Sequence, residues 1–392
     1  MRMLNWIVSL AVLLAPALSA VDVTLVSVNG EEISGPLTAV DPGTGFTVGG
    51  KTLKLEEAAE VRFPGKGEVK TESGTQVLLL TGSTINAKIV SGNEKALKMQ
   101  SPLLGEFEIK NNAIKGVVFT RGDIPDSKFA GFFAGSDPDK DSILTPKAEK
   151  QVGFMVSLSD KALEFDQEGQ KRPIPFEQLG ALRFAELEKF KPLMGVQGSV
   201  TLSDGSKLTG VMNGLKDEKL ELKVYEDQNL SVPVDAIRAL TLAGGKLIYL
   251  SDFPALTVEE KPLVGGFPVI FHWKKNKAVT GGPLKIAGKE YSRGLGVHAY
   301  AKVTLNLEGQ YEKLLVEPGL DDTGLNGPGC SWRIVGDGKE LAKGEAKLGQ
   351  APTQGKFDVK GVKTLELIAD FGPDNDDAGD HLDWANARLV KN

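Results

Sequence analysis

The side chains best suited to binding chemistry are concentrated in the last third of the 392-residue chain. All three histidines, and every tryptophan after residue 20, lie between residues 272 and 384. Aromatic rings bind sugars because a pyranose presents a flat array of C–H groups to the π-system, while nearby polar groups fix its orientation. This segregation predicts one C-terminal module that carries the binding chemistry.

Eight residues of this module are candidate contacts for carbohydrate. Trp332 lies on a predicted strand between a glycine-rich loop and a hairpin, and with the acidic pair Asp321 and Asp322 it is the first candidate for the binding face. Trp384 has polar neighbours, but a tryptophan in a β-sandwich usually packs in the core, so we expect it to matter mainly for folding. The predicted carbohydrate-binding residues are Trp332, Asp321, Asp322, His298, Asp380, His381, Asp383 and Trp384.

Several of these residues also have a structural interpretation. His298 follows apolar strand residues and can be a partly buried, hydrogen-bonded histidine. The pair Asp321 and Asp322 can bind sugar hydroxyls or Ca²⁺, or cap a turn. The segment 370–383 is dense in oxygen ligands and suits either Ca²⁺ or a solvated acidic loop. No other cofactor is expected, and no metal ligand is assigned.

Signatures of enzymes are missing from the sequence. It contains no phosphate-binding P-loop, no G-x-S-x-G and no H-E-x-x-H. A glycosidase needs two carboxylates that flank a cleft, and acidic residues are frequent enough to keep an unrecognised glycoside hydrolase as an alternative. The sequence therefore predicts a non-catalytic protein.

The region from residue 21 to residue 250 repeats itself. Four segments share an apolar residue, a second one three positions later and a third one two positions after that. They are Ala58, Val61, Phe63; Ile114, Val117, Phe119; Leu179, Leu182, Phe184; and Ile237, Leu240, Leu242. Alternating apolar pairs lie between these segments and indicate strands with one buried face. We predict four tandem small β-barrel-like repeats; a propeller is the competing architecture.

The sequence divides into seven parts. Residues 1–20 resemble a signal peptide, with Arg2, a short apolar run and a small-residue cleavage site. Prolines punctuate the stretch after residue 250 and favour an extended connector. The predicted parts are the signal peptide (1–20), the repeats (21–65, 72–122, 141–188 and 195–250), a linker (251–265) and a module (266–392) that folds on its own.

Charge and cysteine content limit the partners. The formal net charge is −6, without long runs of one sign, which disfavours nucleic acid because phosphate binding needs clustered Lys and Arg. No apolar stretch after the signal peptide is long enough to span a membrane. Cys330 is the only cysteine, so no intrachain disulfide can form and each fold must be held by its own core. We expect Cys330 to be a small buried hydrophobe.

The C-terminal module is also predicted to be β, since apolar residues alternate along its predicted strands. Five of its segments, in order, carry recognisable motifs: 294–299 (GLGVHA), 319–322 (GLDD), 335–339 (VGDGK), 359–367 (VKGVKTLEL) and 380–387 (DHLDWANA). Together they resemble the NPCBM family of carbohydrate-binding modules over residues 266–392. The resemblance implies a galactose-binding-like β-sandwich, or jelly roll, of a kind often attached to glycoside hydrolases. Ala301 stands where the family commonly has serine, which removes one polar contact.

The sequence as a whole predicts an all-β, non-catalytic protein that is exported and binds carbohydrate. The C-terminal module engages glycans, and the repeats serve as a spacer or as a surface for other envelope proteins. Location outside the cytoplasm, either secreted or in the periplasm or cell envelope, follows from the signal peptide. A structural envelope or surface scaffold without sugar affinity is the first alternative, and a glycoside hydrolase is the second.

Overall fold

The protein is built almost entirely from β-strands, as the sequence predicts. The computed structural model describes residues 21–63, 74–135, 137–185, 191, 193–226, 228–325 and 329–391. The predicted signal peptide lies outside the described residues. Within them, no helix is long and apolar enough to cross a membrane.

Each repeat is a small barrel-like unit of short antiparallel strands with a 3-10 turn before the last strand. Repeat 1 contains β1 (Asp22–Ser27), β2 (Glu32–Asp41), β3 (Gly45–Val48), β4 (Lys51–Leu53), η1 (Leu55–Glu57) and β5 (Ala58–Arg62). Repeat 2 contains β6 (Gln76–Leu79), β7 (Thr84–Asn86), β8 (Lys88–Asn93), β9 (Ala96–Ser101), β10 (Gly105–Lys110), η2 (Asn111–Ala113) and β11 (Ile114–Val118).

Helix α1 (Asp126–Ala134) connects repeat 2 to repeat 3. Repeat 3 contains β12 (Asp141–Leu144), β13 (Lys150–Leu158), β14 (Ala162–Gln167), β15 (Gln170–Pro175), η3 (Phe176–Gln178) and β16 (Ala181–Arg183). Repeat 4 contains β17 (Gln197–Leu202), β18 (Lys207–Lys216), β19 (Lys219–Tyr225), β20 (Gln228–Pro233), η4 (Val234–Ala236) and β21 (Ile237–Ala243).

The repeated apolar pattern marks the strand that closes each unit. The first strand pairs with both the second and the last, and the middle residue of the pattern faces a buried residue of the first strand. These pairs are Leu25 with Val61, Val77 with Val117, Ile143 with Leu182, and Val200 with Leu240. All eight side chains are at most 1% exposed, so the pattern reports inward-facing positions.

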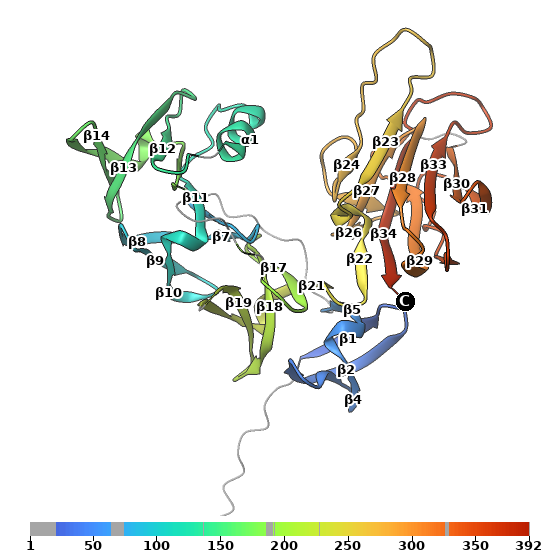
Figure 1. Cartoon of the computed structure of the whole chain (residues 1–392), viewed down its shortest axis with the longest axis horizontal. Coiled ribbons are helices and arrows are strands. Elements are labelled where there is room, and N and C mark those ends of the chain that lie inside the picture. The colour runs from blue at the N-terminus through green and yellow to red at the C-terminus, as the bar shows by residue number, and fades with distance from the viewer. Residues whose placement is uncertain are drawn as a thin grey trace, which may run out of the picture.

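The repeats do not follow one another in space in the order of the chain (Figure 1). The closing strands pair across repeats: β5 with β21, and β11 with β16. Repeats 2 and 4 meet where Lys207 pairs with Thr84 and where the Asn86 side chain donates to the carbonyl of Asp204 at 2.6 Å. The spatial order is therefore 3-2-4-1.

The C-terminal module is a sandwich of two antiparallel sheets. One has the order β24-β27-β34-β29-β32, with β22 also paired to β34; the other has the order β23-β28-β33-β30-β31. The first sheet and its 3-10 turn comprise β22 (Leu247–Tyr249), η5 (Leu250–Asp252), β24 (Lys274–Lys275), β27 (Gly294–His298), β29 (Tyr311–Leu320), β32 (Gly355–Asp358) and β34 (His381–Lys391). The second comprises β23 (Leu256–Glu260), β28 (Ala301–Asn306), β30 (Cys330–Gly336), β31 (Lys339–Ala346) and β33 (Thr364–Asp370).

The module begins earlier than the sequence predicts. Residues 251–265 are expected to be a linker, but β23 within them is an edge strand of the sandwich and pairs with β28 from Leu256 to Glu260. Leu250 and Phe253 are buried in the module core. A fragment that starts at residue 266 would lack these contacts, so the expected independent unit begins near residue 246.

Repeat 1 packs directly against the module. Tyr249 is buried and donates its hydroxyl to the carbonyl of Ala59 at 3.3 Å. Lys313 Nζ donates to Asn29 Oδ1 at 2.9 Å. An apolar cluster joins the two parts and consists of Val28, Ala59, Leu247, Tyr249, Leu315 and Val390. The chain therefore passes from repeat 4 directly into the packed module through β22, without an extended linker between them.

Candidate carbohydrate-binding site

Strand β34 brings most of the predicted polar residues to one end of the module. In the pairing of β27 with β34, His298 faces His381 and Gly296 faces Asp383. Successive side chains of a strand point to opposite sides of a sheet. Leu382 and Trp384 consequently point into the core, while His381 and Asp383 point to the outer face.

A hairpin covers this outer face. It is formed by β25 (Leu284–Ile286) and β26 (Lys289–Tyr291), which pack on Ala385. Two glycines flank Asp383 in the sheet, and both leave room for the covering chain. A Cβ at Gly296 would lie 2.3 Å from the carbonyl oxygen of Lys277, and one at Gly319 would lie 2.7 Å from Ile286 Cγ2.

The acidic pair Asp321 and Asp322 anchors this hairpin. Asp321 Oδ2 accepts a hydrogen bond from the backbone N–H of Lys285 at 3.0 Å, and Asp322 Oδ2 accepts one from Gly288 at 2.9 Å. Asp321 is only 1% exposed. The structure therefore favours the turn-capping interpretation, and the prediction that this pair forms an open binding face is wrong for Asp321.

Asp383 lies against Asp321 beneath the hairpin. It is buried and shares a side-chain hydrogen bond with Asp321. Burial, followed by the negative charge of Asp321, raises the pKa of Asp383 to about 10. Two carboxylates cannot both keep their charge at such a place, so Asp383 is protonated at neutral pH. The second oxygen of Asp383, Oδ2, has no hydrogen-bond partner among the described residues.

Thr323 connects this pair to His381. Its hydroxyl donates to Asp321 Oδ1 and lies 3.1 Å from His381 Nδ1. Because the hydroxyl proton is directed at the carboxylate, Thr323 Oγ1 accepts from His381, which places the imidazole proton on Nδ1. His381 Nε2 is then an acceptor, and it is buried without a partner among the described residues.

His298 and His381 lie together under the ring of Phe271. The ring centroids are 5.2 Å apart for Phe271 and His298, 4.7 Å for Phe271 and His381, and 5.3 Å for the two histidines. Burial lowers the pKa of both imidazoles, so both are neutral at pH 7. His298 Nε2 lies 3.9 Å from Asp377 Oδ2, at the open side of the cluster.

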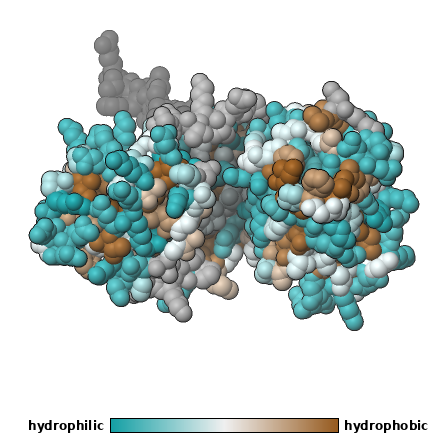
Figure 2. Space-filling model, turned by 90° about the horizontal axis from the view of Figure 1, so that it is seen from above, coloured by the Kyte–Doolittle hydropathy of each residue, from teal (hydrophilic) through white to brown (hydrophobic). Residues whose placement is uncertain are grey.

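A cavity of about 320 Å³ opens beside His298. Its polar and charged side chains are those of Glu260, Lys261, His298, Tyr300 and Asp377, and the ring of Phe271 forms part of its wall. The segment 262–270 supplies the remaining wall and exposes Leu263, Val264, Phe267 and Ile270. Figure 2 shows hydrophobic side chains gathered on the lobe that the module forms. The cavity therefore combines aromatic rings with a few convergent polar groups.

Asp380 and the acidic loop before it do not form a metal site within the residues described. Burial, and then the charge of Asp374, raises the pKa of Asp380 to about 7. Asp374 and Asp376 are exposed. No group of three or more histidine, cysteine or acidic side chains is placed to hold a metal ion in the described part of the chain.

The two tryptophans are core residues. Trp384 is fully buried, as expected, and Trp332 is only 2% exposed. Their rings meet edge to face with centroids 6.3 Å apart. Trp332 alternates with Cys330 and Ile334 on β30, and all three point into the sandwich. The prediction that Trp332 forms an accessible binding face is therefore wrong.

The sequence interpretation does not include Phe271, Tyr300 or Thr323 among the candidate contacts, and it considers Asp377 only as part of the possible Ca²⁺-binding segment 370–383. Phe271 has a signal, because it begins the run Phe-His-Trp just before β24. His272 and Trp273 of this run bind Glu260 instead, through contacts of 2.9 and 2.6 Å. Thr323 and Asp377 lie in loops whose approach to the histidines depends on the fold of the sandwich.

A family model matches the C-terminal module. Residues 246–390 match the NPCBM/NEW2 domain. A protein of Renibacterium salmoninarum, named as a candidate endo-alpha-N-acetylgalactosaminidase, is 30% identical over 112 residues, which are 28% of this chain and 7% of that protein. This chain therefore spans only a small part of that relative's length.

Solved structures of CBM51 modules are similar to parts of the chain. One, from Clostridium perfringens GH95 in complex with methyl-galactose, is 22% identical with a TM-score of 0.32 and covers 37% of this chain and 99% of its own. The tandem CBM51 modules of a family 98 glycoside hydrolase from Streptococcus pneumoniae are 14% identical with a TM-score of 0.33, over 70% of this chain and 96% of their own. The resemblance noted in the sequence is confirmed: residues 246–390 form an NPCBM/NEW2 domain.

Proposed function

We propose that this protein is an exported, non-catalytic glycan-binding protein, and that its C-terminal domain holds sugar in the cavity beside His298. The observation that carries the proposal is the placement of motif residues and aromatic rings around the same opening. His298 and Ala299 belong to the first family motif and line the cavity together with Phe271 and Tyr300.

The chemistry of this opening suits a sugar. The Phe271 ring and the neighbouring apolar segment offer surfaces for sugar C–H groups. The carboxylate of Asp377 accepts from hydroxyl groups, and the neutral imidazole of His298 can accept or donate. The site is shallow and largely apolar, so we expect weak affinity; millimolar binding corresponds to about −4 kcal/mol.

The pair Asp321 and Asp383 is too deeply buried to serve as the two carboxyl groups of a glycoside hydrolase. A glycoside hydrolase places two carboxyl groups on either side of an accessible sugar. Asp321 and Asp383 are each 1% exposed and lie beneath the β25–β26 hairpin. Their hydrogen bond and the shared proton stabilise the hairpin contact without reaching the cavity.

Loss of the cavity groups is expected to weaken glycan binding. The full-length protein should first be screened on a glycan array, and the best ligand titrated by calorimetry. Phe271→Ala and Asp377→Asn should each weaken binding about tenfold or more, as truncation of central contacts does. Asp377→Asn keeps the size of a partly exposed loop side chain, so its melting temperature should stay close to that of the wild type. Phe271→Ala uncovers His298 and His381 and should lower the melting temperature modestly, so circular dichroism must show a folded domain before the titration.

Asp374→Asn is the matched control, because it changes an exposed carboxylate of the same loop outside the cavity lining. It should leave affinity unchanged. Glycan binding that is insensitive to Phe271→Ala and Asp377→Asn would place the site elsewhere. Absence of binding to every glycan at millimolar concentration would favour the structural-scaffold alternative, and release of reducing sugar from a bound glycan would favour a hydrolase.

Export follows from the signal-peptide pattern of residues 1–20. We expect the native protein to begin at residue 20 or 21, which N-terminal sequencing of material from the producing cell would test. A mature chain that retains Met1 would contradict export by this route. In the exported protein the repeats hold the glycan-binding domain at a distance or bind other envelope proteins.

A further inference from the structure

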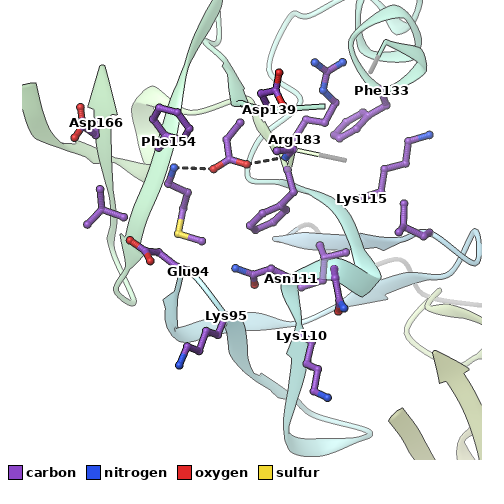
Figure 3. Close-up of a pocket in the computed structure, with 18 of the residues that line it drawn as sticks. Glu94, Lys95, Lys110, Asn111, Lys115, Phe133, Asp139, Phe154, Asp166 and Arg183 are labelled. Carbon is purple, nitrogen blue, oxygen red and sulfur yellow. Dashed lines mark hydrogen bonds between the residues drawn. The ribbon is translucent and has the colours of Figure 1, made fainter. Parts of the chain in front are cut away.

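A second and larger cavity, of about 820 Å³, lies between repeats 2 and 3 (Figure 3). We propose that it is a separate saccharide-binding site for neutral oligosaccharides, so that the repeats bind glycan themselves. The cavity belongs to residues far from the C-terminal domain, and its argument is independent of the site beside His298. Its volume falls within the range of about 300–1,000 Å³ that is usual for small-molecule sites.

The cavity is formed where β13 changes partners. Residues 150–153 of β13 pair with β12, whereas Ser157 and Leu158 pair with β8 of repeat 2. Between these two pairings, residues 154–156 border the opening. The carboxylate of Asp141 holds the gap in place, because it accepts hydrogen bonds from the backbone N–H groups of Met155 at 2.8 Å and Ala185 at 2.7 Å.

An exposed aromatic ring stands at the edge of this gap. Phe154 is 50% exposed and lines the cavity. Leaving a phenyl ring in water has no benefit for folding, whereas a ring beside a cavity offers a stacking surface for a pyranose. Figure 3 shows Phe154 from repeat 3 and Phe133 from the end of α1 on opposite sides of Asp139.

Two polar side chains of the lining are held in place by hydrogen bonds. Arg183 is 4% exposed and donates to the carbonyl of Phe132 at 2.8 Å and to Ser142 Oγ at 3.3 Å, but its Nε has no partner among the described residues. Asn111 donates to the carbonyl of Asn93 at 2.8 Å, and its Oδ1 is likewise without a partner there. Both unpaired atoms are themselves buried, so the two residues contribute to the lining as hydrogen-bonded polar side chains rather than as free groups for a ligand.

The charges of the lining favour a neutral ligand. The basic side chains are those of Lys95, Lys110, Lys115, Lys171 and Arg183, and the acidic ones are those of Glu94, Asp139, Asp141 and Asp166. Figure 3 shows Glu94, Lys95, Asn111 and Lys110 below the opening and Asp139 and Arg183 above it. A polyanion would need a clear excess of positive charge. Mixed charges and amides instead suit a chain of hydroxyl groups.

A peptide strand fits the gap less well. Peptides that extend a sheet bind through free backbone groups of an edge strand. At this edge, the N–H of Met155 already donates to Asp141, which interrupts the ladder that such a peptide would need. A ligand that binds through side chains and a ring face is therefore favoured over an added strand.

The test uses the full-length protein carrying Phe271→Ala, which removes the proposed domain site. Tetrasaccharides of glucose, xylose, galactose and N-acetylglucosamine would be titrated one at a time up to millimolar concentration, with saturation-transfer NMR as readout. At least one should bind. Adding Phe154→Ala should weaken it about tenfold or more, and Phe154→Trp should retain binding because it keeps a ring face.

Val90→Ala is the control, since Val90 is exposed on β8 of repeat 2 outside the cavity lining. It should leave the affinity for the tetrasaccharide unchanged. Each added substitution should leave the melting temperature equal to that of the Phe271→Ala parent, because Phe154 and Val90 are exposed and contribute little to the core. Absence of any binding sensitive to Phe154→Ala overturns the proposal. The proposal is also overturned if an anionic polysaccharide or an extended peptide binds in a way that depends on Phe154 and none of the neutral tetrasaccharides does. If the wild-type protein binds a tetrasaccharide and the Phe271→Ala parent binds none, the domain site stands and this one fails.

Discussion

Trp332→Ala is expected to destabilise the C-terminal domain by about 3–5 kcal/mol, the range for truncating a buried large aromatic side chain. The ring of Trp332 packs edge to face on Trp384 inside the sandwich. Strand β31 lies flat against it, because a Cβ at Gly344 would come within 2.5 Å of Trp332 Cζ2. Removing the ring leaves a cavity that these rigid neighbours cannot fill.

Urea unfolding, followed by tryptophan fluorescence and circular dichroism, measures this effect. Arg333→Ala is the matched control, since Arg333 is the next residue of β30 and its side chain is 42% exposed and paired with Asp370. An exposed ion pair contributes about 0–1 kcal/mol, so this variant should unfold close to the wild type. A Trp332→Ala variant with wild-type stability and lost sugar affinity would return Trp332 to the binding face.

Asp383→Asn is expected to remove a large pH dependence from the stability of the domain. The folded domain holds the Asp383 proton up to a pKa of about 10, whereas an unfolded aspartate loses it near pH 3.9. Between these values only the folded state binds the proton, so the free energy of unfolding falls as pH rises, by up to about 1.4 kcal/mol per pH unit. This stabilisation is complete below about pH 4 and is lost towards pH 10.

Thermal unfolding of both proteins from about pH 5 to about pH 9 tests this sign. The amide that replaces the carboxyl group stays neutral and can donate to Asp321, so the variant should gain stability over the wild type as pH rises. Titrating groups outside the Asp321–Asp383 pair are common to both proteins and cancel in the difference. Glu290→Gln, an exposed carboxylate change on the covering hairpin, should give no such trend. A difference that is independent of pH would mean that Asp383 is ionised in the folded domain.

The sequence predicts the interior of each repeat well. The apolar pattern that ends each repeat falls on the closing strand, because Val61, Val117, Leu182 and Leu240 all face the barrel interior. Period-two alternation is a direct consequence of burying one face of a strand. The same alternation predicts the burial of Trp332, since Cys330, Trp332 and Ile334 alternate with other residues along β30.

The contacts between units have no comparable signal. The pairing of β5 with β21 joins the edge strands of two repeats that are far apart in the chain. The residue pattern of an edge strand does not specify which other strand it pairs with. Likewise, Pro254 and Pro262 suggest a connector, although proline is also tolerated beside an edge strand such as β23. The site residues Phe271 and Asp377 meet only because loops from different strands converge.

The spatial order of the repeats makes the fold nested. Repeats 2 and 3 pair with each other through β11 and β16 and are inserted, as a unit, between two repeats that pair through β5 and β21. Joining the outer pair closes a loop that contains the whole inner pair, and the entropy cost of closure grows only slowly with loop length. We therefore expect a change in the length of the insert to alter the folding rate more than the final stability.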